Sequence, residues 1–481
     1  MWAFAIYDKE KEIIFCSRDR FGIKPFYYTE INDKLVFGSE IKQLLEFYDK
    51  RFINQKVLMD YLVIGYENHT EETFFENIFE LCPSCNLIYD LKQNKYRIEK
   101  YYNIQNEILN LDEQSSIEEY ERRIYESVEM RLRSDVKVGT CLSGGLDSST
   151  IAAIASKKYF EKTNEKFIAI HAKSIEKETD ESFFAKEVSK YCNLDLNIVE
   201  PSCKEFIDVI DEVIYTQEEP FGSPSIFMQY YVMKKAKDIE CTVMLDGQGG
   251  DETLLGYERY YPAYLISLGF AKFFKSFFNA VNNSKLSKKQ LIQFFIYFTN
   301  PKIRLYYLKK NNKFIKEEYF NKINKEILEK NTRSYLNIFD LQYIEIFSTQ
   351  LPHLLRYEDR NSMRHSIETR LPFLDYKVIE TALSIKSRFK MKNGWTKFIL
   401  RKVADKILPE NIVWRKNKFG FEAPTKSWLE SIKVEIKESI ESSGIIKEIT
   451  HNLNINSLNE KQKWKLFNIA KWEQVYNVKI N

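Results

Sequence analysis

A short glycine- and serine-rich stretch has the residue types that most clearly suggest chemistry in this chain. It follows a predicted buried strand and leads into a predicted helix, whose N-terminus favours an anion such as a phosphate. Its two glycines allow a tight turn that brings backbone N–H groups near a ligand, and its serines add hydroxyl donors. Its aspartate would repel a phosphate unless a hard cation such as Mg²⁺ lay between them. The stretch reads Leu142, Ser143, Gly144, Gly145, Leu146, Asp147, Ser148 and Ser149.

This pattern predicts a phosphate-binding loop, although it is not a Walker loop, because it has no lysine and no GxxxxGK[ST] spacing. An ordinary strand-to-helix turn is the alternative, and it would need two glycines, three serines and an aspartate by coincidence.

A second glycine-rich stretch, VMLDGQGGDETLLGYERYY, also follows a predicted buried strand. Its glycines again permit a close approach of the backbone to a ligand. Asp246, Asp251 and Glu252 offer carboxylates for a metal ion or for a network that positions a nucleophile. A plain glycine-rich turn is the alternative here too.

The elements that must position both loops alternate between strand and helix. Strands are predicted within residues 135–142, 166–174, 194–200 and 241–246, and helices within 115–133, 148–160, 181–192, 204–216 and 225–238. Ser116 with Glu119 predicts a capping box at the first of these helices. Such alternation indicates a parallel sheet covered on both faces, with ligands beyond the carboxyl ends of its strands.

The regions before and after this alternating part differ from it in composition and in predicted structure. The first hundred or so residues show short strand-like runs with turns, and residues 1–7 read as a strand with no turn or cap before them. Residues 102–113 are polar and predict a linker. Residues 260–350 are helical and rich in Lys, Phe and Tyr, which favours a solvated surface over a face that contacts a partner.

The composition of the chain sets further bounds. With 481 residues, 44% hydrophobic and 29% charged, two or three soluble globular domains are expected. The 72 Lys and Arg residues against 69 Asp and Glu give a net charge of +3, which offers no argument for a nucleic-acid or membrane partner. Seven scattered cysteines and the lack of a long apolar run predict a cytoplasmic protein. The Cys82-Pro83-Ser84-Cys85 pair and the five histidines, among them His353 and His365, are interpreted as structural.

Taken together, these stretches resemble the glutamine-hydrolysing asparagine synthetase family. SGGLDSS is similar to the pyrophosphate-binding loop of ATP pyrophosphatases, and LDGQGGDE to the second signature of the synthetases. LPHLLRYEDRNSMRHSIETRLPFLD and KFILRKVADKILPENIVWRKNKFGFEAP resemble that family's C-terminal signatures. WAFAIYD, RDRFGIKPFYY and FGSEIKQLL resemble the second half of its glutamine amidotransferase domain. The last fifty residues carry no signature.

The resemblance implies an α/β protein of two domains. Residues 1–105 would form a truncated amidotransferase-like domain, an α+β sandwich of the N-terminal-nucleophile type. Residues 106–481 would form the synthetase domain. Its core, about 114–258, would be a doubly wound parallel-sheet ATP pyrophosphatase fold of the adenine nucleotide alpha-hydrolase type, followed by a helical extension, about 259–481.

The family mechanism implies ATP and Mg²⁺ between the two loops, with Asp147 and Asp251 as metal carboxylates. Aspartate would attack ATP to give β-aspartyl-AMP and pyrophosphate, and ammonia would then displace AMP to give asparagine. The catalytic assignments are Lys397, which matches the lysine that meets the nucleotide phosphates, together with Asp251 and Gln248. Leu142, Ile170, Asp246 and Gly247 would line the nucleoside.

Two departures from the family pattern qualify this interpretation. The family's glutaminase nucleophile is an N-terminal cysteine, whereas residue 2 here is Trp and the first cysteine is Cys16 in a predicted strand. We therefore expect that the first half of the amidotransferase domain is missing. Ammonia would be the direct nitrogen source, derived from glutamine if an upstream half or a partner supplies it.

The second departure is Gln248, where several members carry a glutamate, because a neutral amide cannot act as a base. Two alternatives therefore stay open, a related enzyme that adenylates a sugar or peptide carboxylate and an inactive gene remnant. The expected partners are aspartate and ammonia, with no nucleic acid and no membrane, and a homodimer is compatible with the resemblance.

Overall fold

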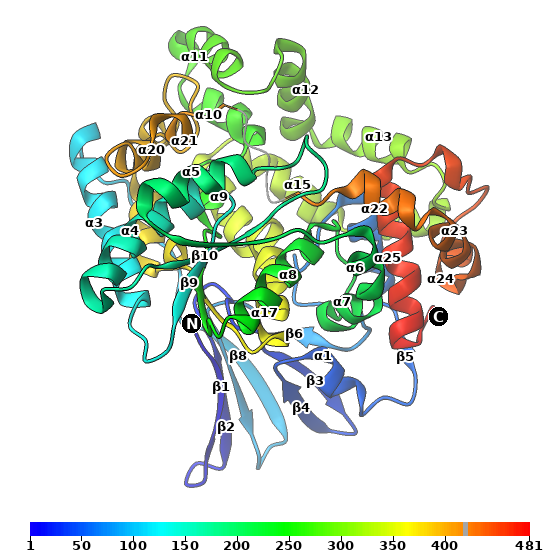
Figure 1. Ribbon diagram of the computed structural model, residues 1–481. Helices are drawn as coiled ribbons and strands as arrows, with labels where there is room; N and C mark the ends of the chain where they lie inside the picture. Colours follow the sequence, from blue (N-terminus) through cyan, green and yellow to red (C-terminus); the bar gives the residue numbers. More distant parts are fainter. Residues whose placement is uncertain (417–421) are drawn as a thin grey trace.

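The first hundred residues form two antiparallel sheets in a computed structural model that describes residues 1–416 and 422–481. One sheet has the strand order β1-β2-β7-β8 and the other β4-β3-β6, and Cys16, Phe26 and Leu87 belong to the core beside them. The strands are β1 (Ala3–Asp8), β2 (Ile13–Arg18), β3 (Tyr27–Ile31), β4 (Lys34–Gly38), β6 (Phe79–Glu80), β7 (Cys85–Asp90) and β8 (Lys95–Lys100). The predicted strand at the start of the chain is confirmed, and it lies at the edge of its sheet (Figure 1).

A parallel sheet of five strands forms the centre of the molecule, in the order β11-β10-β9-β12-β13. Its strands are β9 (Val138–Cys141), β10 (Ile168–Ala172), β11 (Asp195–Val199), β12 (Val243–Leu245) and β13 (Glu368–Arg370). The first four confirm the predicted strands, whereas β13 was not predicted. Because the chain leaves β9 toward β10 on one side and returns as β12 on the other, the carboxyl ends of β9 and β12 meet at a switch point, where ligands of such sheets bind.

Helices cover both faces of this sheet, because alternate residues of a strand point to opposite sides. Ala169 and Leu245 belong to the core that includes α3, α4 and α5, whereas Ile170 and Met244 belong to the core that includes α8. The helices of this part are α3 (Glu113–Arg131), α4 (Leu146–Thr163), α5 (Ser182–Cys192), α6 (Cys203–Asp208), α7 (Ile210–Gln217) and α8 (Ser225–Asp238). The predicted doubly wound α/β class is thus confirmed.

Two local predictions were wrong. The capping box of Ser116 with Glu119 does not begin α3, because the carboxylate of Asp112 caps the helix by accepting the N–H of Ser115 at 2.8 Å. The single helix predicted for residues 204–216 is two helices, α6 and α7, that meet at Val209.

The rest of the chain is mainly helical, as predicted for residues 260–350. The elements are α9 (Gly250–Thr253), η2 (Glu258–Tyr260), α10 (Tyr261–Ser267), α11 (Phe270–Asn283), α12 (Lys288–Thr299), α13 (Pro301–Asn311), α14 (Glu317–Phe320), α15 (Lys325–Ser334), α16 (Ile338–Ile344), η3 (Glu345–Thr349), α17 (Leu351–Arg364), η4 (Pro372–Leu374), α18 (Tyr376–Ser384), α19 (Ser387–Lys390), α20 (Phe398–Ala404), α21 (Glu410–Val413), α22 (Thr425–Ser431), α23 (Lys433–Ser442), α24 (Gly444–Ile449), η5 (Ile455–Ser457) and α25 (Glu460–Tyr476). The part of the last predicted signature at residues 417–421 lies outside the described residues. None of the helices in the described parts has the length and apolar character that crossing a bilayer requires.

The C-terminal helix α25 connects the first hundred residues to the central sheet region (Figure 1). The indole N–H of Trp464 donates to the carbonyl of Phe221 at 2.9 Å, and that of Trp472 donates to the carbonyl of Glu218 at 2.7 Å. Trp472 also packs on Phe75, with 4.9 Å between ring centroids. Strand β14 (Val478–Lys479) then pairs with β5 (Arg51–Phe52), near α1 (Ile41–Leu45), α2 (Gln55–Met59) and η1 (Asp60–Ile64). The last fifty residues, which carry no signature, therefore join the two parts of the chain.

Candidate active site

The two predicted loops lie side by side, because they follow adjacent parallel strands. Strand β9 pairs with β12 in the register Thr140 opposite Leu245, and each loop begins directly after its strand. A Cβ atom added at Gly247 would lie 3.0 Å from the backbone nitrogen of Ser148, and one at Gly250 would lie 2.9 Å from Oδ1 of Asp147. A side chain at Gly250 would displace the carboxylate of Asp147, and one at Gly247 would press on the backbone of the first loop, so the two glycines favour this close approach.

Lys397 brings the two predicted metal carboxylates together. Its ammonium lies 2.5 Å from Oδ2 of Asp147 and 2.5 Å from Oδ1 of Asp251, and the side chain is almost fully buried. The residue adopts a left-handed conformation, with φ +52°, just before α20. Gly256 lies against this group, since a Cβ there would fall 2.0 Å from Oδ1 of Asp251 and 2.1 Å from Cε of Lys397. Three of the predicted site residues thus meet at one point.

A cavity of about 550 Å³ opens beside this cluster. The hydroxyls of Ser143 and Ser148 are 2.9 Å apart at its wall, and the N–H of Gly145 donates to Ser143 Oγ at 3.2 Å. The predicted residues that line the cavity are Ser143, Gly145, Asp147, Ser148, Asp246, Gly247, Gln248 and Asp251. Leu142, Gly144, Leu146, Ser149 and Ile170 are not among the residues that line the cavity. The roles of all the predicted residues in nucleotide binding stay predictions.

The rest of the cavity wall comes from residues that the sequence did not assign. Helix α17 contributes His353 and Tyr357, α25 contributes Lys461 and Lys465, and the segment after η1 contributes Glu67. Burial lowers the pKa of His353 to about 3, so its imidazole is neutral. Burial also lowers the pKa of Lys465 to about 7. His353 and Tyr357 belong to a stretch that resembles a family signature, whereas no pattern in the sequence marks the two lysines.

A pair of buried carboxyl groups lies next to Gln248. Asp246 accepts the N–H of Gly247 at 2.5 Å, and burial raises its pKa to about 6. Glu358 on α17 is 1% exposed, and its Oε2 accepts Nε2 of Gln229 at 2.5 Å. Its other oxygen, Oε1, is buried, and the side chains of Asp246 and Gln248 lie close to this carboxyl group.

Burial first, and the charge of Asp246 second, hold the pKa of Glu358 well above its ordinary value. Two adjacent buried carboxyl groups cannot both ionise readily, so the pair shares a proton. A carboxyl group that sequence reasoning missed thus lies beside Gln248.

Asp147 and Asp251 have donor chemistry that fits Mg²⁺. Two carboxylates converge on the position that the Lys397 ammonium bridges, and Mg²⁺ is usually held by one or two carboxylates together with substrate phosphates. No cluster of three or more His, Cys, Asp or Glu side chains within residues 1–416 and 422–481 forms a metal site by itself. A nucleotide would therefore have to complete the coordination.

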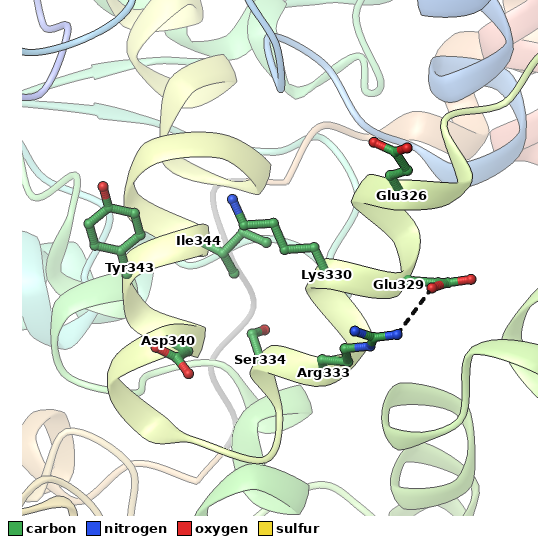
Figure 2. A pocket seen from close by; sticks show the side chains of 8 residues that line it. All are labelled: Glu326, Glu329, Lys330, Arg333, Ser334, Asp340, Tyr343 and Ile344. Atoms are coloured by element: carbon green, nitrogen blue, oxygen red, sulfur yellow. Dashed lines mark hydrogen bonds and ion pairs between the residues drawn. The ribbon is translucent and has the colours of Figure 1, made fainter. Parts of the chain in front are cut away.

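A second hollow lies between α15 and α16, and it does not share the features of this site. Its wall carries charged side chains such as Glu329, Lys330 and Arg333, and Arg333 forms an ion pair with Glu329 at 3.5 Å (Figure 2). Neither glycine-rich loop contributes to it. The cavity at β9 and β12 is accordingly the candidate active site.

The cysteine pair fits its structural interpretation. Cys82 and Cys85 are free thiols, and burial raises the pKa of Cys82 to about 11. Ser84 between them has φ +65°, which indicates a tight turn. His365 ends α17 and packs edge-on against Tyr230, with 4.6 Å between ring centroids.

Two family models match most of this chain. The family described as asparagine synthase matches residues 119–476, and a glutamine amidotransferase domain matches residues 1–102. Asparagine synthetase [glutamine-hydrolyzing] 1 of Bacillus subtilis (strain 168) is 28% identical over 476 residues, covering 90% of this chain and 69% of its own length. Asparagine synthetases 2 and 3 of the same organism are 30% and 27% identical, covering 84% and 86% of this chain.

This chain spans 53% of the length of the second of these relatives and 66% of the third. The synthase match includes both glycine-rich loops, Lys397 and all of α25, and it extends over more than half of the residues. On this evidence the chain belongs to the asparagine synthase family.

Proposed function

We propose that this chain makes asparagine by ATP-dependent amidation of aspartate, with β-aspartyl-AMP as the intermediate and AMP and pyrophosphate as products. The observation that carries the proposal is the meeting of Lys397, Asp147 and Asp251 where two glycine-rich loops converge on one cavity. In a member of the asparagine synthase family, such a cluster would bind a polyphosphate and stabilise the charge that develops on it.

The residues of the first loop would hold the pyrophosphate part of ATP. The hydroxyls of Ser143 and Ser148 and the N-terminus of α4 supply donors and a partial positive charge at the cavity wall. Lys397 would stabilise negative charge on the phosphate and carbonyl oxygens as the aspartate carboxylate attacks the α-phosphorus. Mg²⁺ held by Asp147 and Asp251 would neutralise the phosphates when bound.

Amide formation then needs a proton acceptor. Ammonia forms a bond to the carbonyl carbon, the bond to AMP breaks, and the nitrogen must lose a proton. The amide of Gln248 cannot accept it. Asp246 lies at the cavity wall with a pKa of about 6, so it is ionised at neutral pH and is the proposed acceptor, with Glu358 as the neighbour that shares its proton.

Ammonia is the proposed nitrogen source for residues 1–481. The first cysteine, Cys16, lies within β2 and is fully buried, and burial raises the pKa of its thiol to about 12. A thiol of this kind is a poor nucleophile. No glutaminase residue is therefore assigned in this chain.

The test measures pyrophosphate and asparagine from aspartate and Mg²⁺–ATP, with either ammonium or glutamine as the nitrogen donor. Asparagine is expected with ammonium and not with glutamine alone. Asp251→Asn serves as the active-site control and should abolish both products. Equal rates with glutamine alone would overturn the ammonia assignment, and no aspartate-dependent pyrophosphate release would overturn the proposed function.

A related adenylating enzyme that uses another carboxylate is the second candidate, and Gln248 beside Asp246 and Glu358 is the observation that favours it. Exchange of labelled pyrophosphate into ATP, measured with aspartate, sugar carboxylates and small peptides, separates the two. Stimulation by aspartate alone would exclude the second candidate.

A further inference from the structure

A stretch of 58 residues between Glu258 and Glu317 contains no Asp or Glu at all. Residues 259–316 carry ten lysines and two arginines. The remaining 60 Lys and Arg residues stand against all 69 Asp and Glu, so the rest of the chain has a net charge of −9. The small overall charge of +3 therefore conceals a strong asymmetry, with +12 on one segment. This segment includes helices α11, α12 and α13.

Helix α11 presents aromatic side chains on two faces. Phe273 and Phe277 pack against a buried core that includes Tyr264 and Ala280. Phe270, Phe274 and Phe278 follow one another at helical spacing on the other face and are 84%, 59% and 48% exposed. Exposure of three large aromatic side chains in one row is unusual for a surface that only contacts water.

Helix α12 continues this surface. Ile292 and Ile296 are exposed on it, and the ammonium of its first residue, Lys288, lies 5.1 Å from the centre of the Phe278 ring on α11. Phe273 and Phe295 join the two helices below, with 6.0 Å between ring centroids. Both helices lie at one end of the molecule, away from the central sheet (Figure 1). We define the α11–α12 surface by its residues, which are Phe270, Phe274, Phe278, Ile292 and Ile296 with Lys272, Lys275, Lys288 and Lys289.

The chemistry of this surface decides between partners. Lysines beside exposed Phe and Ile fit the interface of an anionic bilayer, where the apolar side chains enter the acyl boundary and the ammonium groups meet lipid headgroups. Single-stranded RNA stacks its bases on aromatic side chains and arginine, and the exposed Ile292 and Ile296 offer no flat face for such stacking. Of the two arginines here, Arg304 is buried and Arg259 pairs with Glu345 at 2.5 Å. A second copy of the same face would meet it with equal positive charge.

We propose that the α11–α12 surface docks this protein on an anionic lipid bilayer. The protein lies on the membrane without spanning it. The rest of the chain is negatively charged, so the anionic bilayer repels it. The uneven distribution of charge therefore also orients the molecule with α11 and α12 toward the lipid.

The test is co-sedimentation of the full chain with vesicles of phosphatidylcholine that contain about 30% phosphatidylserine, compared with phosphatidylcholine alone. Binding is expected only to the anionic vesicles, and it should weaken when salt is raised from about 0.1 M to about 0.5 M. Lys272→Glu/Lys275→Glu should lower the partition coefficient by about tenfold or more, because each lysine near the membrane surface strengthens the attraction to anionic lipid. Phe274→Ser/Phe278→Ser should lower it by about tenfold as well.

Phe47→Ser/Lys50→Glu is the matched control, since Phe47 is also an exposed aromatic side chain but lies at the end of α1. It should bind like the unchanged chain. Thermal unfolding and aspartate-dependent pyrophosphate release in solution should be unaffected in all three variants, which shows that they fold. Equal binding to both kinds of vesicle, no effect of the Phe substitutions, or preferential binding to RNA would overturn the proposal.

Discussion

Arg356 offers the sharpest test of how this structure is held together, because it joins three parts of the chain. On α17, its guanidinium donates to Oε2 of Glu219 at 2.9 Å, to Oε2 of Glu67 at 2.9 Å and to the carbonyl of Pro220 at 2.9 Å. Both glutamates are buried, and burial raises the pKa of each carboxyl in spite of the arginine. Glu67 belongs to the first hundred residues and lines the candidate active site.

Arg356→Met keeps most of the apolar volume and removes the cation that the two carboxylates share. Removing one partner of a buried ion pair costs about 3–5 kcal/mol, because the charge left behind is neither solvated nor paired. The entropy of unfolding of a globular protein is about 2.1 cal/mol/K per residue, or roughly 1 kcal/mol/K for a chain of this length. The melting temperature should therefore fall by about 3–5 °C.

The loss of stability in Arg356→Met should depend on pH. Without the arginine, both carboxyls have folded-state pKa values even further above the ordinary value than they have now. Between the unfolded and folded pKa the folded state binds more protons, so stability falls as pH rises through this window. The variant should therefore differ little from the unchanged chain near pH 5 and show its full deficit near pH 8. Glu67→Gln and Glu219→Gln, added to Arg356→Met, remove the buried charges and should restore at least half of the loss at pH 8.

Thermal unfolding followed by fluorescence at both pH values measures these differences. A shift below about 1 °C at pH 8 would refute the reasoning, because it would mean that the buried carboxylates need no cation. The same loss at pH 5 and pH 8, or no recovery in the triple variant, would show that Arg356 acts through packing alone.

Two further predictions concern the second loop. Burial raises the pKa of Glu252 to about 7, so the folded state holds a proton there between the ordinary pKa and about pH 7, and stability falls as pH rises across this range. Glu252→Gln should raise the free energy of unfolding by up to about 3 kcal/mol near pH 8 and leave it unchanged near pH 4.5. Urea unfolding at the two pH values measures this difference. An equal change in the free energy of unfolding at both pH values would contradict the prediction. Gly256→Ala should lower the rate of asparagine formation by about 100-fold, because the added methyl group must displace Asp251 or Lys397. A rate within threefold of that of the unchanged chain would show that the cluster tolerates this displacement.

The position of the candidate active site was predictable from the sequence because its two loops are local patterns. Buried strands, glycines and carboxylates follow one another directly at residues 138–149 and 243–256, and adjacent parallel strands bring such loops together. Lys397 is different, since it lies 250 positions from Asp147 along the chain. Only the family resemblance indicated it, because spacing carries no information across such a distance.

What the sequence could not predict depends on contacts between distant segments. Strand β13 has three residues, Glu368–Arg370, and its extended backbone is fixed by pairing with β12. Glu358 lies in a helix among other charged residues, and nothing in that pattern tells that its side chain turns inward to Gln229. The start of α3 shows the same limit locally, because Asp112 and Ser116 both fit a cap, and only the hydrogen bond of Asp112 to Ser115 decides between them.

The last fifty residues show why a stretch without a motif can still matter to the chemistry. Lys465 on α25 lines the cavity, and its ammonium donates to the carbonyls of Tyr61 and Leu62 in η1. The same helix carries Trp464, which fixes the carbonyl of Phe221, one residue before the cavity wall at Gly222. The active-site wall is thus built by three regions of the chain at once. A catalytic loop can be recognised by its own residues, but the cavity wall beside it is built by segments that only the whole fold brings together.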